Sequence, residues 1–383
     1  MAVTDYRTLT YIRSVNGTKQ YINTGVNYNA NNAVRVVAQG VSTSATGGKS
    51  VTGQMFKSGW YLNVWNQNGY WCVRNYTGSA DEDYHSSIDI TTKTTIYVNK
   101  KVLYINGSSV KTFSDVASSS SNNLAIFNNK VSEGSDGAWT VYSWEHWKNG
   151  TKDRNMVPAR RISDSVVGMY DTINNVFYTN SGSGSFTAGS YVTYTLTLTA
   201  GTGGTVSGGG KMYQNPDGKA RFTAKATANS GYRFVGWYSN SSYTTLVSSS
   251  TSYSSTMTAN LTLYAKFIAQ YTVTASISPT GGGTVTGTGT YDTGTSVTVV
   301  ATPATDYSFV NWTSNGTVVS TSASYTFTLS SATALIANFK KNGNIHLKLN
   351  GSWVNGMMYF KVNGQWVEGK PYIKVNGQWK EGI

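Results

Sequence analysis

Tryptophan and asparagine side chains gather in short strand-like segments of this chain, and together they suit the binding of sugars. A sugar presents C–H faces that stack on aromatic rings, and its hydroxyls bond to amide groups. In LNVWN (62–66), Trp65 and Asn66 are adjacent, and only part of the tryptophans can be buried in a two-sheet core. We therefore predict that Trp65 and Asn66 lie at the rim of a glycan-binding site.

A second group of tryptophans lies near the C-terminus, each thirteen residues from the next: Trp353, Trp366 and Trp379. Each follows an Asn-Gly pair, which supplies the two positive-φ residues of a type I′ hairpin turn. Counting outward from Asn363-Gly364 pairs a lysine with each tryptophan, which suits ammonium–ring contact. We predict that Trp366 and Trp379 bind glycan.

The opposite face of these hairpins is apolar, and hairpins of this size cannot bury a core alone. We expect this face to lie against another protein surface, either a second copy of the chain or a particle. The assembly surface is predicted to consist of Phe360, Val362, Val367, Ile373 and Val375.

Hydrolytic chemistry finds little support. Glycosidases need two carboxyl groups flanking one bond, and the E-x-D-x-x-E pattern of jelly-roll hydrolases is missing. Acidic residues cluster instead in GSADEDYHSS, which resembles a solvated loop; a calcium site at Asp81 and Asp83 is the alternative. His146 is expected in the core, and Cys72 is expected to be a small buried residue. We predict no catalytic residue, no metal ligand and no cofactor.

Composition indicates an all-β class. The 383 residues include 40 glycines and 5 prolines, only 12% are charged, and no long helical period is visible. One cysteine excludes an intramolecular disulfide. No segment resembles a signal peptide or a membrane span. The net charge of +13 is uneven but forms no dense basic cluster. We therefore expect soluble strand edges rather than contact with anionic polymers such as cell-wall glycans or nucleic acid, and no specific nucleic-acid binding.

Two copies of one unit occupy residues 191–269 and 270–341. Four anchors recur in the same order: YTLT with YTVT, GGTVSG with GGTVTG, YRFVGW with YSFVNW, and LYAKF with LIANF. The copies resemble the bacterial internalin-type B-repeat and its divergent relatives, although Asp306 and Asn311 replace its usual glycines. The resemblance implies small β-rich modules that serve as spacers or adhesive stalks.

Residues 1–190 end in VVGMYDTINNVFYTNSGSGSFTAG (166–189), and together with KQYINTGV and LNVWN this stretch resembles a concanavalin-like, laminin-G-type lectin domain. The resemblance implies a jelly-roll sandwich of two antiparallel sheets. Strand alternation then places Tyr142, Trp144 and His146 on the inward face. The expected architecture is a jelly-roll β-sandwich (1–190), two β-rich modules (191–269 and 270–341) and three 13-residue hairpins (342–383).

These features predict a non-enzymatic phage virion protein, a fibre, tail or capsid-decorating component that adheres to host-surface or mucosal glycans. Expected partners are other virion proteins, a host-surface glycan and further copies of the chain. A bacterial cell-surface adhesin is the alternative. A glycan-degrading enzyme is the third class, because jelly rolls also host glycosidases.

Overall fold

A computed structural model describes residues 2–14, 20–26, 29, 31–41, 49–53, 62–76, 81–114, 124–127 and 138–342, and the strands of the C-terminal hairpins. In these residues the chain consists of strands and turns, with a single 3₁₀ turn at Val3–Asp5 (η1). None of the described elements is a helix long and apolar enough to cross a membrane. The prediction of an all-β fold is confirmed.

The chain divides into two compact units. The first comprises Met1–Leu198, Gly208–Ala224 and Ser252–Leu263, and the second comprises Thr199–Ser207, Lys225–Thr251 and Tyr264–Ile383.

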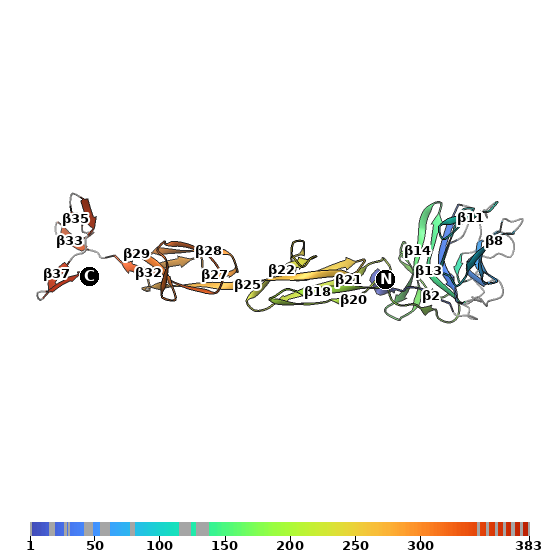
Figure 1. Cartoon of the computed structure of the whole chain (residues 1–383), viewed down its shortest axis with the longest axis horizontal. Coiled ribbons are helices and arrows are strands. Elements are labelled where there is room, and N and C mark those ends of the chain that lie inside the picture. Colours follow the sequence, from blue (N-terminus) through green and yellow to red (C-terminus); the bar gives the residue numbers. More distant parts are fainter. Residues whose placement is uncertain are drawn as a thin grey trace. The chain divides into compact units, whose positions relative to one another are not determined.

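The first unit contains a sandwich of two sheets (Figure 1). The larger sheet runs in the order β11-β10-β9-β4-β13-β14-β15-β16, with β1 also on β14, and β2 between β13 and β17. Its strands are β1 (Tyr6–Thr8), β2 (Ile12–Arg13), β4 (Ala33–Gly40), β9 (Thr94–Asn99), β10 (Val102–Ile105), β11 (Ser108–Thr112), β13 (Trp139–Lys148), β14 (Thr151–Arg161), β15 (Val167–Asp171), β16 (Val176–Tyr178) and β17 (Thr187–Ala188). The smaller sheet contains β3 (Ile22–Asn23), β12 (Ala125–Ile126), β5 (Lys49–Gly53), β6 (Leu62–Gln67), β7 (Tyr70–Tyr76) and β8 (Asp81–Asp89) in that order.

One apolar core joins the two sheets. Val34 and Val36 of β4 and Trp144 of β13 point into it from the larger sheet, while Leu62 and Val64 of β6 enter from the smaller one. Because alternate residues of a strand face opposite sides, the intervening side chains of β4 face away from the core. Across the sheets the Trp71 and Trp139 rings pack with their centroids 5.2 Å apart.

A β-bulge overturns part of the predicted inward face. Trp144 and His146 are buried, as predicted, but Tyr142 is only half-buried. The register against β4 shifts between Val141 and Ser143, so one extra residue stands in β13 at Tyr142. Val141 and Trp144 therefore both enter the core, and the Tyr142 hydroxyl instead donates to Gln39 Oε1 at 2.7 Å.

The acidic segment at residue 81 is a strand, not the expected loop. Strand β8 pairs with β7, which sets Asp83 opposite Arg74 and His85 opposite Cys72. The Arg74 guanidinium bonds to both carboxylate oxygens of Asp83 at 2.6 Å. Ladder pairing and this ion pair outweigh the weak strand preference of aspartate.

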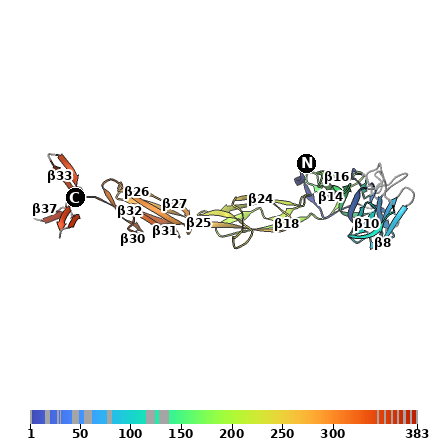
Figure 2. The ribbon, with the colours of Figure 1, turned by 90° about the horizontal axis from the view of Figure 1, so that it is seen from above.

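Two repeats follow the sandwich in the sequence. The first supplies β18 (Thr193–Ala200), β19 (Gly204–Ser207), β20 (Gly210–Tyr213), β21 (Ala220–Ala228), β22 (Tyr232–Tyr238), β23 (Leu246–Ser248) and β24 (Ser252–Met257). Strand β25 (Leu261–Ser278) ends the first repeat and begins the second. The second repeat continues with β26 (Gly283–Thr286), β27 (Gly289–Asp292), β28 (Ser296–Pro303), β29 (Tyr307–Ser314), β30 (Thr317–Ser320), β31 (Ser324–Thr328) and β32 (Thr333–Lys341). Figure 1 labels β28 and β29, and Figure 2 labels β26, β30 and β31.

The recurring sequence anchors occupy equivalent structural positions in both repeats. Trp237 and Trp312, from YRFVGW and YSFVNW, are fully buried. The glycine directly before Thr-Val leaves room for the phenylalanine that ends the last anchor: a Cβ on Gly204 would lie 2.3 Å from the Phe267 ring, and one on Gly283 would lie 2.5 Å from the Phe339 ring. The motif requires glycine because backbone and ring approach this closely.

The C-terminal strands form three separate two-stranded hairpins, β33 (Ile345–Leu349) with β34 (Ser352–Gly356), β35 (Tyr359–Val362) with β36 (Gln365–Glu368), and β37 (Tyr372–Val375) with β38 (Gln378–Glu381). Lys348 lies opposite Trp353, Lys361 opposite Trp366, and Lys374 opposite Trp379. The register read from the Asn-Gly pairs is confirmed.

Candidate functional site

The prediction that Trp65 and Asn66 lie at the rim of a binding site is wrong. Trp65 is only 6% exposed and Asn66 only 1% exposed. The Arg74 guanidinium covers the Trp65 ring, 5.2 Å from its centroid, and is itself held by Asp83. The Asn66 amide oxygen accepts a hydrogen bond from the Gly69 backbone at 2.9 Å, which closes the β6–β7 turn. Neither side chain is available at a rim.

Of the remaining positions predicted to bind glycan, protein or calcium, the structure describes the side chain of Asp83 only. Side chains of Trp366, Trp379 and the predicted assembly surface (Phe360, Val362, Val367, Ile373 and Val375) lie outside the described residues, as does that of Asp81. The Asp83 carboxylate already binds Arg74, so a calcium ion there would have to displace an arginine. In the described part of the chain, no group of three His, Cys, Asp or Glu residues is placed to hold a metal.

The two candidate nucleophile or base positions are interior. Cys72 is fully buried, with Sγ 3.0 Å from His85 Nδ1, and burial raises the pKa of its thiol to about 11. A thiol with this pKa is a weak nucleophile at neutral pH. His146 is 1% exposed and its Nδ1 lies 2.6 Å from Asp153 Oδ1. Both interpretations as buried residues are confirmed.

A continuous row of aromatic and charged residues crosses the outer face of the larger sheet. Tyr104 lies opposite Tyr97, Tyr97 opposite Arg35, Arg35 opposite Glu145, and Glu145 opposite Asn155. Residues directly opposite share a face, and the neighbours of Tyr97 and Arg35 in their own strands point into the core. The row therefore faces away from the core across five adjoining strands.

Trp147 completes this row, which we call the outer-face cluster (Tyr97, Tyr104, Trp147, Arg35, Glu145 and Lys152). The Trp147 ring packs edge-on against Tyr97 at 5.4 Å between centroids, and Tyr97 lies 5.6 Å from Tyr104. Lys152 Nζ lies 4.8 Å and the Arg35 guanidinium 5.4 Å from the Trp147 centroid. All three rings are half-buried, so each keeps a solvent-facing part.

Electrostatics fix the geometry of the outer-face cluster. Glu145 is 5% exposed; it accepts a hydrogen bond from Lys152 Nζ at 2.5 Å and another from Arg35 Nε. Burial alone would raise the pKa of Glu145, but the bonds from Arg35 and Lys152 hold it below its ordinary value. The ionised carboxylate therefore anchors two cations beside the aromatic rings. Such a surface offers ring faces for sugar stacking and charged donors for hydroxyl groups.

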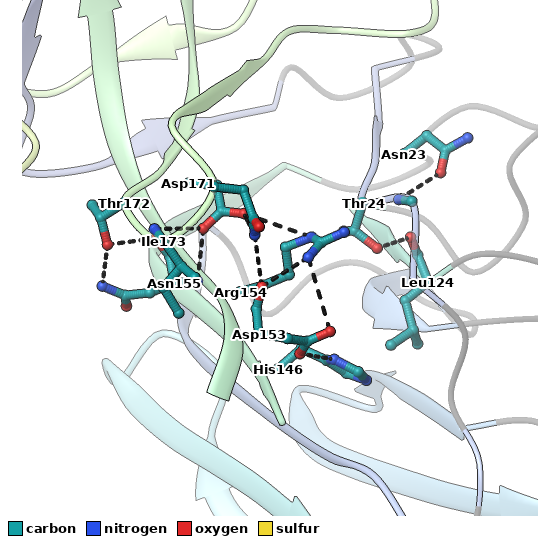
Figure 3. A network of polar contacts seen from close by, with 12 residues as sticks. Asn23, Thr24, Leu124, His146, Asp153, Arg154, Asn155, Asp171, Thr172 and Ile173 are labelled. Atoms are coloured by element: carbon teal, nitrogen blue, oxygen red, sulfur yellow. Dashed lines mark hydrogen bonds and ion pairs between the residues drawn. The ribbon is translucent and has the colours of Figure 1, made fainter. Parts of the chain in front are cut away.

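A partly buried polar network lies at the adjoining end of β14 (Figure 3). Arg154 lies between two carboxylates, with Nε 3.6 Å from Asp171 Oδ2 and Nη1 3.9 Å from Asp153 Oδ2. Asp171 is fully buried and accepts hydrogen bonds from the backbones of Asn155 and Ile173, both at 3.1 Å. Because Asp171 has no exposed surface, we interpret this network as structural: it fixes strand ends rather than meeting a ligand.

A concave pocket of about 200 Å³ lies at the other end of β14, and all of its lining residues belong to the first unit. Arg7 of β1 and Arg160 and Arg161 of β14 line it, with Tyr191 and Tyr213. Tyr191 is held by a bridge to Leu9, and Tyr213 by pairing with Thr193 of β18. Next to Tyr213, Gln214 accepts from Thr8 N at 2.8 Å and donates to Val192 O at 2.9 Å. We call this the arginine–tyrosine pocket.

Sequence reasoning missed both the outer-face cluster and the arginine–tyrosine pocket. The alternation of β4 and β9 was visible, with Val34, Val36, Ile96 and Val98 spaced by two residues. It could have assigned Arg35 and Tyr97 to the outer faces of their strands. It could not have made the two strands neighbours, because they are about sixty residues apart in the chain.

Comparison with protein families supports the interpretation of the repeats. Residues 194–270 and residues 271–343 each match the Divergent InlB B-repeat domain. The resemblance read from the four anchors is therefore confirmed for these two segments, which make up about two fifths of the chain. No curated protein gives a significant match.

Two solved structures with partial likeness to this chain are binding domains of other proteins. The binding domain of Paraclostridial Mosquitocidal Protein 1 is 14% identical, with a TM-score of 0.25, and the match covers 37% of this chain and 42% of that one. The binding domain of Botulinum Neurotoxin DC in complex with SialylT is 12% identical with a TM-score of 0.24, covering 79% and 70%. At these scores the likeness carries no argument about function, and the concanavalin-like resemblance of residues 1–190 is not confirmed by it.

Proposed function

We propose that the chain is a non-enzymatic adhesive protein of a phage virion, a fibre, tail or capsid-decorating component whose lectin-like sandwich binds host-surface or mucosal glycans. The observation that carries the proposal is the outer-face cluster. Three half-buried aromatic rings and two cations lie on the solvent face of a rigid sheet, an arrangement suited to sugars.

The rest of the chain supports display rather than catalysis. Two modules matching a B-repeat domain follow the sandwich, and hairpins end the chain. Their shared strand β25 leaves no linker between the modules. In this proposal the hairpins bind other virion proteins or further copies of the chain.

Binding is tested with the full chain on a glycan array, followed by titration of the best ligand. Trp147→Ala removes the ring that both cations contact and should weaken binding at least about tenfold, a loss of about 1.4 kcal/mol. Tyr70→Ala is the matched control, since Tyr70 is an exposed ring on the other sheet and should bind as the wild type does.

Three results would contradict the proposal: no glycan bound at all, equal binding by Trp147→Ala, or release of new reducing ends from the bound glycan. The last would make the protein an enzyme. Near-ultraviolet circular dichroism of each variant checks that the fold is kept.

The second candidate is a bacterial cell-surface adhesin, favoured by the B-repeat matches. In this second candidate function the glycan site is the same, and only the surface on which the protein is displayed differs. Antibody labelling in electron micrographs of purified particles and of intact cells separates the two. Label on cells and none on particles would reject the virion assignment.

A further inference from the structure

The arginine–tyrosine pocket contains two arginines whose positions destabilise the folded protein unless a ligand is bound. In the pairing of β1 with β14, Arg7 lies directly opposite Arg160. Like charges in directly opposite positions on a sheet repel and destabilise the pair. Nothing in the hydrogen bonding of these strands requires arginine at either position, since the ladder uses only backbone groups.

Among the residues that the structure describes, neither arginine has a carboxylate to balance it. In the described parts of the chain no acidic residue pairs with Arg7 or Arg160, and Arg160 Nε is a buried donor without a hydrogen-bond partner. Arg161 differs, because it bonds to both carboxylate oxygens of Asp164, at 2.9 and 2.5 Å. The pocket therefore keeps two uncompensated guanidinium groups, one of which has an unused donor.

The tyrosines hold these two cations in place without neutralising them. The Arg7 guanidinium lies 5.6 Å from the Tyr213 ring, and the Arg160 guanidinium lies 5.6 Å from the Tyr191 ring. The two rings meet edge to face at 5.2 Å. Ring contacts leave the N–H groups of a guanidinium free to bond in the plane of the group.

We infer that the arginine–tyrosine pocket binds the carboxylate of an acidic sugar. Guanidinium forks match the planar carboxylate geometry, and two forks offer more donors than one carboxylate needs. Tyr191 and Tyr213 are 38% and 41% exposed, so they present faces on which the pyranose ring can stack. A volume of about 200 Å³ suits one sugar unit rather than an extended chain.

This site is distinct from the outer-face cluster, although the choice of a sugar as ligand rests on the proposed function. It predicts selectivity for glycans bearing uronic or sialic acids over neutral glycans. A phosphate or a carboxylate of an acidic peptide shares the chemistry, and the test includes both.

The test titrates the full chain with trigalacturonate and with 3′-sialyllactose, and with the carboxyl-reduced form of each. Arg160→Gln and Arg7→Gln should each weaken binding of at least one acidic sugar about tenfold or more, the effect of losing a charge-assisted bond. Reduction of the sugar carboxyl group should weaken binding by the same factor. Arg221→Gln is the control for net charge: Arg221 belongs to the same unit but pairs with Asp217, and its loss should change affinity less than twofold.

A second measurement needs no knowledge of the natural glycan. At equal ionic strength, sodium glucuronate should raise the melting temperature of the wild type more than sodium chloride does, and Arg160→Gln should abolish that difference. Arg7→Gln without ligand should melt no lower than the wild type, because it removes a like-charge pair.

The inference is overturned if neither acidic sugar binds and glucuronate has no effect that depends on Arg160, if reduced and acidic forms bind equally, if Arg221→Gln loses as much as Arg160→Gln, or if inorganic phosphate or hexaglutamate binds more tightly than both sugars. Neutral glycans that still bind through Trp147 would then leave the proposed function intact. Failure of every glycan, with a glucuronate effect that depends on Arg160, would reject the proposed function and keep the pocket.

Discussion

Glu145 offers the sharpest test of the outer-face cluster. Glu145→Gln keeps the shape of the side chain but removes the charge that holds Arg35 and Lys152 beside Trp147. Hydrogen bonds to a buried charged group are worth about 1.5–3 kcal/mol each. Here the gain is smaller, because Arg35 and Lys152 are 40% and 35% exposed and the carboxylate is itself desolvated. We expect a net loss of about 1–2 kcal/mol at pH 7.

The pH dependence of this loss follows from the direction of the pKa shift. In the folded protein the pKa of Glu145 lies below its ordinary value, which is about 4.3 in an unfolded chain. Its contribution to stability is therefore complete above the unfolded pKa and disappears as the pH falls through the folded one. Wild type and Glu145→Gln should differ in stability at pH 7, and the difference should shrink as the pH falls below the unfolded pKa.

Calorimetry of the full chain measures this difference, with Trp144→Ala identifying the transition of the first unit, since Trp144 lies in its core. For a unit of this size, 1–2 kcal/mol corresponds to a shift of about 2–8 °C in the melting temperature. Asp217→Asn, which removes a partly exposed pair with Arg221, should shift it less. A shift that is the same at pH 3 and pH 7 would refute the reasoning, because it would then come from packing and not from charge.

Three further outcomes are expected. Gly283→Ala should destabilise the second repeat by about 1–3 kcal/mol in calorimetry, because the new Cβ meets Thr302 O at 2.4 Å and the Phe339 ring at 2.5 Å, whereas the exposed neighbour Thr284→Ala should change little. Cys72, with a pKa of about 11, should react with iodoacetamide at pH 8 at least a hundredfold more slowly in the native protein than in urea, as followed by mass spectrometry. Removing residues 343–383 should leave the calorimetric transitions of the remaining chain unchanged and abolish self-association in sedimentation or incorporation into particles; normal incorporation would contradict the assembly role of the hairpins.

The sequence-based predictions that the structure confirms depend on local features of the chain, namely turn residues and residue spacing. The hairpin register depends only on Asn-Gly turns and on pairing outward from them, so residue spacing was sufficient. The repeat anchors could be recognised because buried aromatic residues and a sterically required glycine, such as Trp312 and Gly283, recur at matching positions. Period-two alternation likewise puts Leu62 and Val64 on one face of their strand, and in the structure both enter the core.

The remaining features depend on which strands pair in the folded protein. The bulge at Tyr142 depends on how β4 is matched to β13 across about a hundred residues, and no local signal marks it. Trp65 is buried because a distant ion pair, Arg74 with Asp83, holds a cation over its ring.

Both candidate sites have the same origin. Tyr97, Arg35 and Glu145 come from three strands, and Arg7 and Arg160 from two strands separated by more than 150 residues. The sequence determined the class of the fold, the repeats and the side chains available on each strand face. Strand order and register alone determined which of those side chains meet, because a hydrogen-bonded ladder joins residues by their position in the sheet and not by their distance along the chain.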